Sequence, residues 1–160
     1  MLAALVSFSE MNDPPPTNTR ADLAARLENL GSALGAREAA HSRDLAEARR
    51  HVELLRARVE EALERFHAAA TRAGAPYLQI DLSEVRTDDK HLRAVEFNLT
   101  RGRHKAVITA KSRGEVALVG PFSTGKTEGP CKSFSFDATD EISAALGDFL
   151  EAFLDRAATP

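Results

Sequence analysis

The sequence contains no tryptophan, one tyrosine and one cysteine among its 160 residues. A single cysteine excludes an internal disulfide, so we expect a reducing, cytoplasmic setting, and we interpret Cys131 as a half-buried structural thiol. Long apolar runs are also missing: no stretch of 18 apolar residues occurs, so we expect no membrane contact through a spanning segment. The opening MLAALVSF is short and has no basic residues before it, so it does not predict a secretory signal.

The sequence has no strong excess of charge of one sign, but its charges are unevenly distributed. The net charge is −3, which on its own gives no reason to expect a nucleic-acid partner. Residues 86–132, however, contain ten basic and five acidic residues, whereas residues 137–156 contain six acidic residues and one arginine. A polyanionic partner would therefore meet the central part of the chain and avoid its last segment.

Proline is absent between Thr19 and Ala73, where Ala, Arg, Leu and Glu dominate. These are good helix formers, so we predict a long helical segment over residues 18–73. Its start resembles a capping box with Asp in place of Glu, and Gly74 followed by Pro76 favours its end. Two glycines, Gly31 and Gly35, favour a bend or break near residues 31–36. Three consecutive prolines precede this helix, and we expect residues 1–17 to be poorly ordered.

Within this helix, apolar residues recur at alternating steps of three and four. The pattern is typical of a coiled-coil seam and lasts for more than three heptads. Towards the N-terminus, Leu34 and Leu27 continue one seam position, but Glu38 and Gly31 interrupt the other. We predict a dimer seam centred on the largest of the regularly spaced side chains: Leu45, Val52, Leu55, Val59 and Phe66.

The length of this segment favours a second copy as the partner. Residues 45–69 would form a helix of about 37 Å, whereas five-residue strands span only about 17 Å. Part of the seam would face water unless another chain covered it, and a homodimer is the economical solution. Parallel and antiparallel pairing both fit the pattern. The alternative is that the helix packs lengthwise on its own sheet and folds back at the glycine pair.

The second half of the chain predicts an antiparallel sheet. Apolar and polar residues alternate in five stretches, and short connections containing glycine join most of them. An antiparallel meander of four or five strands follows from this pattern. The stretches are residues 77–82, 93–100, 104–111, 115–122 and 131–136.

The last segment predicts an amphipathic helix that packs on this sheet. Asp137 and Asp140 lie where a helix start favours acidic residues, and the apolar residues from Ile142 to Leu154 follow helical spacing. The fold class is therefore α+β, with a long N-terminal coiled-coil-like helix, a β-meander and a C-terminal helix. We expect three parts: a disordered segment (1–17), the long helix (18–73) and a β-meander with the final helix (74–160).

Residues 120–127 match the P-loop pattern G-x-x-x-x-G-K-[ST] in full. A P-loop also needs a helix that begins at the lysine and directs its amides at the phosphates. Here Pro130 follows Thr127 closely, and residues 131–136 alternate as a strand does. We therefore predict a hairpin at this position, and we interpret the match as coincidental.

No other motif predicts catalysis or metal binding. The three histidines of the long helix include no pair at i and i+4. The paired acids Asp88-Asp89 and Asp81/Glu84 have no candidate general base as a partner, so we interpret them as turn and surface residues. We predict a non-enzymatic, dimeric interaction or adaptor module without a cofactor or metal, acting through a second copy and a protein partner. High alanine and arginine usage indicates a GC-rich, bacterial genome.

The alternative function is nucleic-acid binding through basic hairpin loops. In a meander, alternate turns emerge at the same end of the sheet, so two loops would bring four cations together: Arg101, Arg103, Lys105 and Lys126. Aromatic residues for base stacking are scarce outside the predicted core, which counts against this hypothesis. Binding of a small ligand, or a catalytic activity without a recognised motif, is a third alternative.

Overall fold

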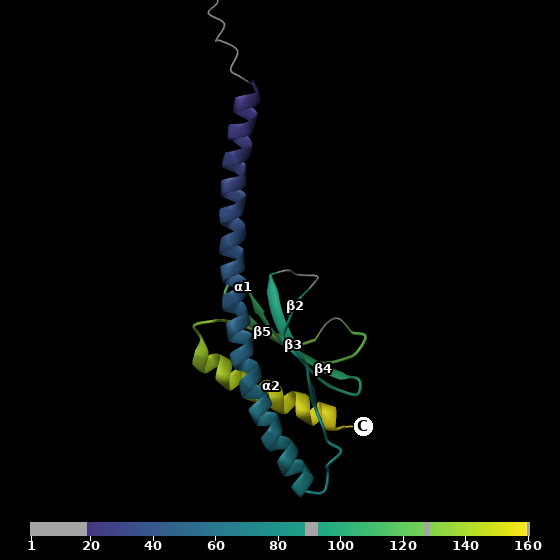
Figure 1. The fold of residues 1–160 in the computed structure, drawn as a ribbon. Coiled ribbons are helices and arrows are strands. Elements are labelled where there is room, and N and C mark those ends of the chain that lie inside the picture. Colours follow the sequence, from purple (N-terminus) through teal and green to yellow (C-terminus); the bar gives the residue numbers. More distant parts are fainter. Residues whose placement is uncertain (1–18, 89–92, 127–128, 160) are drawn as a thin grey trace, which may run out of the picture. The chain divides into compact units, whose positions relative to one another are not determined.

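A computed structural model describes residues 19–88, 93–126 and 129–159 (Figure 1). By internal contacts the chain divides into two units, with the boundary between Glu38 and Ala39 inside the long helix. The second unit holds the sheet, the C-terminal helix and the core.

The long helix, α1, covers Thr19–Arg72 without interruption. The break expected near Gly31 and Gly35 is therefore absent. At the other end, Gly74 adopts a φ of 96°, which only glycine accepts easily. The amide of Gly74 donates to the carbonyl of Thr71, and the amide of Ala75 donates to that of Ala70. This pair of bonds is a Schellman motif, so the prediction of Gly74 as the helix stop is confirmed.

The sheet is antiparallel and has six strands. Its main path runs β1-β3-β4-β5-β6, and β2 pairs with β3 beside β1. The four longer strands form a meander with short connections. The bounds are β1 (Asp81–Leu82), β2 (Arg86–Thr87), β3 (Ala94–Arg101), β4 (His104–Lys111), β5 (Glu115–Ser123) and β6 (Cys131–Ser135).

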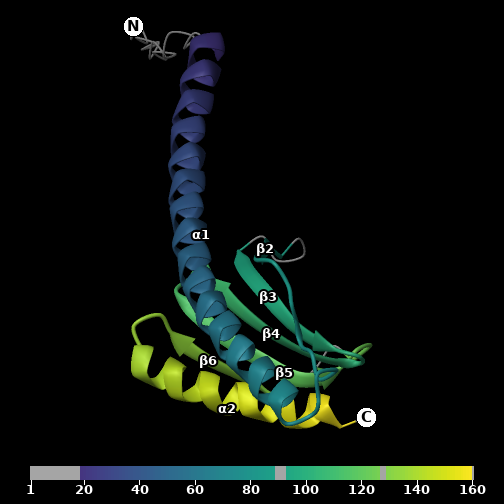
Figure 2. The same cartoon turned by 60° about the horizontal axis from the view of Figure 1, so that its bottom comes forward.

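The second helix, α2 (Thr139–Ala158), packs on the same face of the sheet as the part of α1 after residue 38. In Figure 2 the later part of α1 crosses in front of the strands, and α2 runs below them. Inward residues of neighbouring strands lie opposite one another, as Phe97 does to Ile108 and Ile108 to Leu118. One core joins these strands to both helices, and its largest fully buried side chains are Phe97 and Phe153. The predicted α+β class, with a C-terminal helix on an antiparallel sheet, is confirmed.

Two details differ from the sequence prediction. Only the end of the stretch 77–82 pairs as a strand, because residues 75–79 form turns, and residues 83–85 separate β1 from β2. The lone cysteine, Cys131, is exposed at the start of β6 and is not half-buried as predicted. It lies on an edge strand, whose side chains are covered by neighbours on one side only.

Candidate interaction surfaces

The predicted dimer seam lies in the core of its own chain. Val52, Leu55 and Val59 are buried among residues of the sheet and of α2, and Leu45 and Phe66 pack against this cluster while partly exposed. The placement does not support a seam between two copies at these five positions, since their own sheet already covers them. The alternative that the helix packs lengthwise on its sheet is what the structure has for residues 39–72.

Burial along this part of α1 follows the straight-helix period of 3.6, not the strict heptad. The heptad places Ala62 in the seam, but Ala62 is exposed and Leu63 is buried in its place. Two successive steps of four, from Leu55 to Val59 and from Val59 to Leu63, keep the apolar stripe facing a flat sheet. A supercoiled pair would instead need steps that average 3.5.

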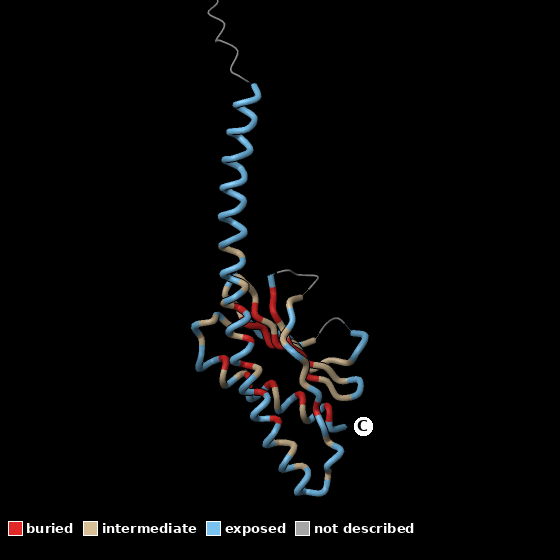
Figure 3. Tube along the Cα trace, in the orientation of Figure 1, coloured by how far each residue is buried: buried red, intermediate tan, exposed pale blue. Residues whose placement is uncertain are grey.

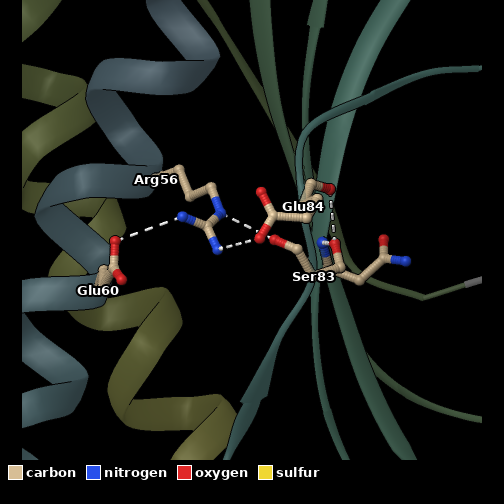
Figure 4. A network of polar contacts seen from close by, with 5 residues as sticks. Arg56, Glu60, Ser83 and Glu84 are labelled. Atoms are coloured by element: carbon tan, nitrogen blue, oxygen red, sulfur yellow. Dashed lines mark hydrogen bonds and ion pairs between the residues drawn. The ribbon is translucent and has the colours of Figure 1, made fainter.

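A polar network fastens α1 to the chain between β1 and β2 (Figure 4). The Nε atom of Arg56 donates to the carbonyl oxygen of Ser83 over 2.8 Å. Its two terminal nitrogens lie 3.3 Å from Glu60 and 3.6 Å from Glu84. The amide of Asn98 in β3 donates to the hydroxyl of Ser83, which ties the same segment to the sheet. This arginine therefore serves the packing of the second unit.

The N-terminal part of α1 carries a different apolar surface. Every residue from 19 to 38 is exposed, as the pale blue trace in Figure 3 shows. Four leucines in this stretch are spaced by steps of four, three and four, and they are between 44% and 58% exposed. We call them the leucine row: Leu23, Leu27, Leu30 and Leu34. No described residue covers the row, so within the described part of the chain it is the principal unpartnered apolar surface.

Sequence reasoning found only half of this row. A strict heptad repeat includes Leu27 and Leu34 at one seam position but places Glu38 and Gly31 at the other, so it misses Leu23 and Leu30. The signal for Leu23 and Leu30 was present as the 4-3-4 spacing. Spacing alone does not distinguish these four leucines from the apolar residues later in α1. Only burial does, because the later residues pack in the core.

Local interactions alone support the helix over residues 19–38 weakly. Asp22 and Arg26 form one exposed ion pair at 4.0 Å, worth about 0.3–0.5 kcal/mol. Gly31 and Gly35 each cost about 1 kcal/mol relative to alanine. Neither glycine has a positive φ, and a Cβ added to either would meet no atom within 4 Å. The described chain therefore gives no packing reason for these two glycines.

The four basic residues predicted at one end of the sheet lie in or beside two adjoining connections: Arg101 ends β3, Arg103 is in the β3–β4 turn, Lys105 is in β4 and Lys126 is in the β5–β6 loop. The amide and the hydroxyl of Thr124 both donate to the carbonyl oxygen of Arg103, at 2.6 and 3.0 Å. This contact joins the β3–β4 turn to the start of the β5–β6 loop, and Lys126 follows two residues later. Arg101 has another role, since its guanidinium donates to the carbonyl of Ala157 near the end of α2.

The two ends of the sheet differ in how their cations are paired. Among the described residues, Arg103, Lys105 and Lys126 form no ion pair. At the other end, Arg86 lies 3.0 Å from Glu96, and Arg113 lies 2.6 Å from Glu115. The hydroxyl of Ser133 and the guanidinium of Arg113 hold the pKa of Glu115 below its ordinary value. Arg93 and Lys111 at this second end form no ion pair with a described residue either, so the unpaired described cations number three at the end with Arg103 and two at the other.

The P-loop match forms the hairpin between β5 and β6. Val119 pairs with Cys131, and the amide of Gly120 donates to the carbonyl of Pro130 over 2.8 Å. A strand therefore follows this loop where a P-loop needs a helix. Gly120 has a φ of 120°, and a Cβ there would lie 3.1 Å from the backbone of Ala106. Close approach to β4, where the pairing register shifts, accounts for this glycine without a phosphate.

Two grooves of the described chain lie beside α1. They share Arg56 and Glu60, and the larger one, about 310 Å³, is open and mostly lined by charged side chains. Neither holds a nucleophile placed beside a base. Residues 19–88, 93–126 and 129–159 contain no group of three or more His, Cys, Asp or Glu side chains placed to hold a metal ion. None of the described helices has the length and apolarity that crossing a bilayer requires.

Comparisons with known proteins give no further guide to function. A scan against models of protein families finds no match to this chain, and searches of curated proteins and of solved structures find none either.

Proposed function

We propose that this chain is a non-enzymatic interaction module that assembles with a second copy through residues 19–38 of α1. The leucine row carries the proposal. Four leucines at coiled-coil spacing, each about half exposed, lie on a helix segment that no described residue covers. A monomer would leave this row in water and would hold the helix by weak local pairs alone. A second copy would cover the leucine row and would thereby stabilise the helix.

The assembled pair would act as an adaptor that presents two copies of the unit formed by residues 39–160. We also propose that the chain acts in the cytoplasm of a bacterium. Its one cysteine is exposed and free, which suits a reducing compartment.

The test is the oligomeric state of two leucine variants. Replacing Leu27 and Leu30 together with lysine places charge in the middle of the row, and we expect a monomer at every concentration. The unchanged chain should show a concentration-dependent dimer in sedimentation equilibrium. Leu54→Lys is the matched control, because Leu54 lies on the same helix and is 62% exposed but belongs to the second unit. Its dimer should be unchanged.

Either of two results would refute this function. The unchanged chain could sediment as a monomer up to millimolar concentration, or the double variant could keep the dimer of the unchanged chain. The unit formed by residues 39–160 should stay folded in both variants. Amide hydrogen exchange in the buried strands β3 and β4 is the check of folding, because the near-ultraviolet signal of the single tyrosine, Tyr77, is too weak to follow it.

A second candidate function is binding to the phosphate backbone of nucleic acid. The unequal pairing of cations favours it, since Arg103, Lys105 and Lys126 remain unpaired within the described chain at one end of the sheet. Each cation that neutralises a phosphate releases counterions, so binding would weaken steeply as salt rises.

We expect the triple variant R103A/K105A/K126A to lose salt-dependent binding to a duplex, measured by fluorescence anisotropy. The slope of log K against log salt should fall by about 0.9 for each lost phosphate contact. The control removes two cations from the other end, as K111A/R113A, and should keep the slope. An equal loss in both variants would mean that total charge, and not this surface, is responsible.

A further inference from the structure

The two sides of the leucine row differ in character. At 100° per residue, the four leucines occupy a band about 60° wide on the helix. On one side of this band lie three residues without large side chains: Ala24, Gly31 and Gly35. The other side carries Arg26 and Arg37. A partner helix can approach closely on the first side only, and this approach would account for two glycines that the chain's own packing does not need.

The small side is bounded at each end by a charge. Arg20 and Glu38 are 18 residues apart, which is five complete turns, so both point in the same direction beside the row. Both are exposed, and neither forms an ion pair with a described residue. The residues at i±3 and i±4 from them offer no opposite charge within the helix, unlike Asp22 and Arg26. The two charges are thus available to a partner.

Charge complementarity distinguishes the two orientations of a homodimer. In a parallel pair in register, Arg20 would lie level with the partner's Arg20 and Glu38 with the partner's Glu38, so these opposite charges would not meet. In an antiparallel pair centred near Asn29, Arg20 would face the partner's Glu38 at both ends. The same alignment interleaves the leucines of the two copies, each within one residue's rise of a leucine across the interface.

Energy also favours the close approach. Four half-exposed leucines per copy bury little apolar surface when a second copy covers them. Association costs both copies freedom of motion, which this burial only roughly offsets. Leucines alone therefore leave a marginal dimer, and contact along the small side with an ion pair at each end would strengthen it.

We propose that residues 19–38 of two copies pair antiparallel, with Arg20 of each copy against Glu38 of the other. This proposal rests on the proposed function and adds to it the partner's orientation and the groups that select it. The occupant of the leucine row is a second copy of this chain, and the arrangement is isologous, so each contact occurs twice.

Site-specific cross-linking of the full chain tests the orientation. Two chains are made with Cys131 replaced by serine, one carrying Arg20→Cys and the other, with an added mass tag, Glu38→Cys. Each is treated with a short bismaleimide alone and as a mixture. We expect cross-linked dimers in the mixture, containing one chain of each kind, and none from either chain alone. Cross-linked dimers from each chain alone would show parallel pairing and overturn the proposal.

Charge reversal gives a second, independent measurement. R20E and E38R, each alone, place like charges together at both ends of an antiparallel pair, and each should weaken dimerisation about tenfold. The double variant R20E/E38R restores opposite charges and should recover the affinity of the unchanged chain to within about threefold. A parallel pair would show no such recovery, because positions 20 and 38 would each stay level with the identical charge of the partner in all three variants.

The two proposals fail in different ways. If the unchanged chain is monomeric, no cross-link forms in any mixture and the proposed function fails as well. If L27K/L30K abolishes the dimer while neither the mixed cross-link nor the charge recovery is seen, dimerisation through the leucine row stands and the antiparallel arrangement alone is wrong.

Discussion

Replacing Val59 with aspartate is expected to unfold residues 39–160, not merely to separate two copies. Val59 is fully buried between the sheet and α2, so the carboxylate would have neither water nor a partner. An uncompensated buried charge costs about 3–5 kcal/mol, and the lost valine packing adds to this, against a total stability of about 5–15 kcal/mol for a typical domain. We expect loss of the cooperative unfolding transition in urea at neutral pH, followed by circular dichroism.

Leu54→Asp is the matched control, five residues earlier on the same helix. Leu54 is exposed, so its replacement should change the free energy of unfolding by less than about 0.5 kcal/mol. The comparison also separates the two sequence-based hypotheses for this stretch. If Val59→Asp gave a stable, folded monomer, the residue would belong to an interface between copies, and the core described above would be wrong.

The second large effect is expected from Phe153→Ala in α2. Phe153 is fully buried against the sheet, and its removal deletes a ring from the centre of the core. Truncations of this kind cost about 3–5 kcal/mol, the sum of lost burial and the cavity left behind. The midpoint of urea unfolding should fall accordingly, with little change in the slope of the transition.

Leu150→Ala on the same helix provides the comparison. Leu150 is only partly buried at the margin of the core, so its truncation should cost clearly less than that of Phe153. Equal costs would indicate that the margin and centre of the interface are packed alike, contrary to the burial seen along α2. Both variants should keep the dimer, because α2 lies outside the leucine row.

Most of the fold could be predicted from the sequence because its signals are local. Gly74 marks the end of α1, Gly102 and Gly114 occupy turns with positive φ, and period-two alternation locates β3, β4 and β5. The split of the first strand was not predictable in this way. It depends on Ser83, whose backbone and hydroxyl both bond to Asn98, a contact between residues 15 apart.

The partner of α1 could not be predicted, because spacing alone does not say what covers an apolar stripe. Val52 and Val59 fit a seam between copies and a seam against a sheet equally well. What decided the matter was the chain's own sheet, whose inward side chains Phe97 and Ile108 need a helix above them. Once those positions are assigned to the core, the leucines before residue 38 remain as the surface without a partner.

For the basic residues, the topology of the sheet was informative but the contacts of single side chains were not. Topology predicts that the connections carrying Arg103 and Lys126 lie at one end of the sheet, since the turns of a meander alternate between its ends, and the amide of Thr124 does donate to the carbonyl of Arg103. It could not reveal that Arg101 is bound to a carbonyl of α2, because that contact depends on where the final helix ends.

The edge strands of the sheet disfavour aggregation of this chain by strand pairing. One margin is cut into two strands of two residues each, and the other begins after Pro130 and carries Lys132. Neither offers a long, uncharged row of free backbone groups onto which another sheet could add. Fibrous aggregation through β-pairing is thereby discouraged, and a helical contact can raise the number of copies to two without starting a polymer.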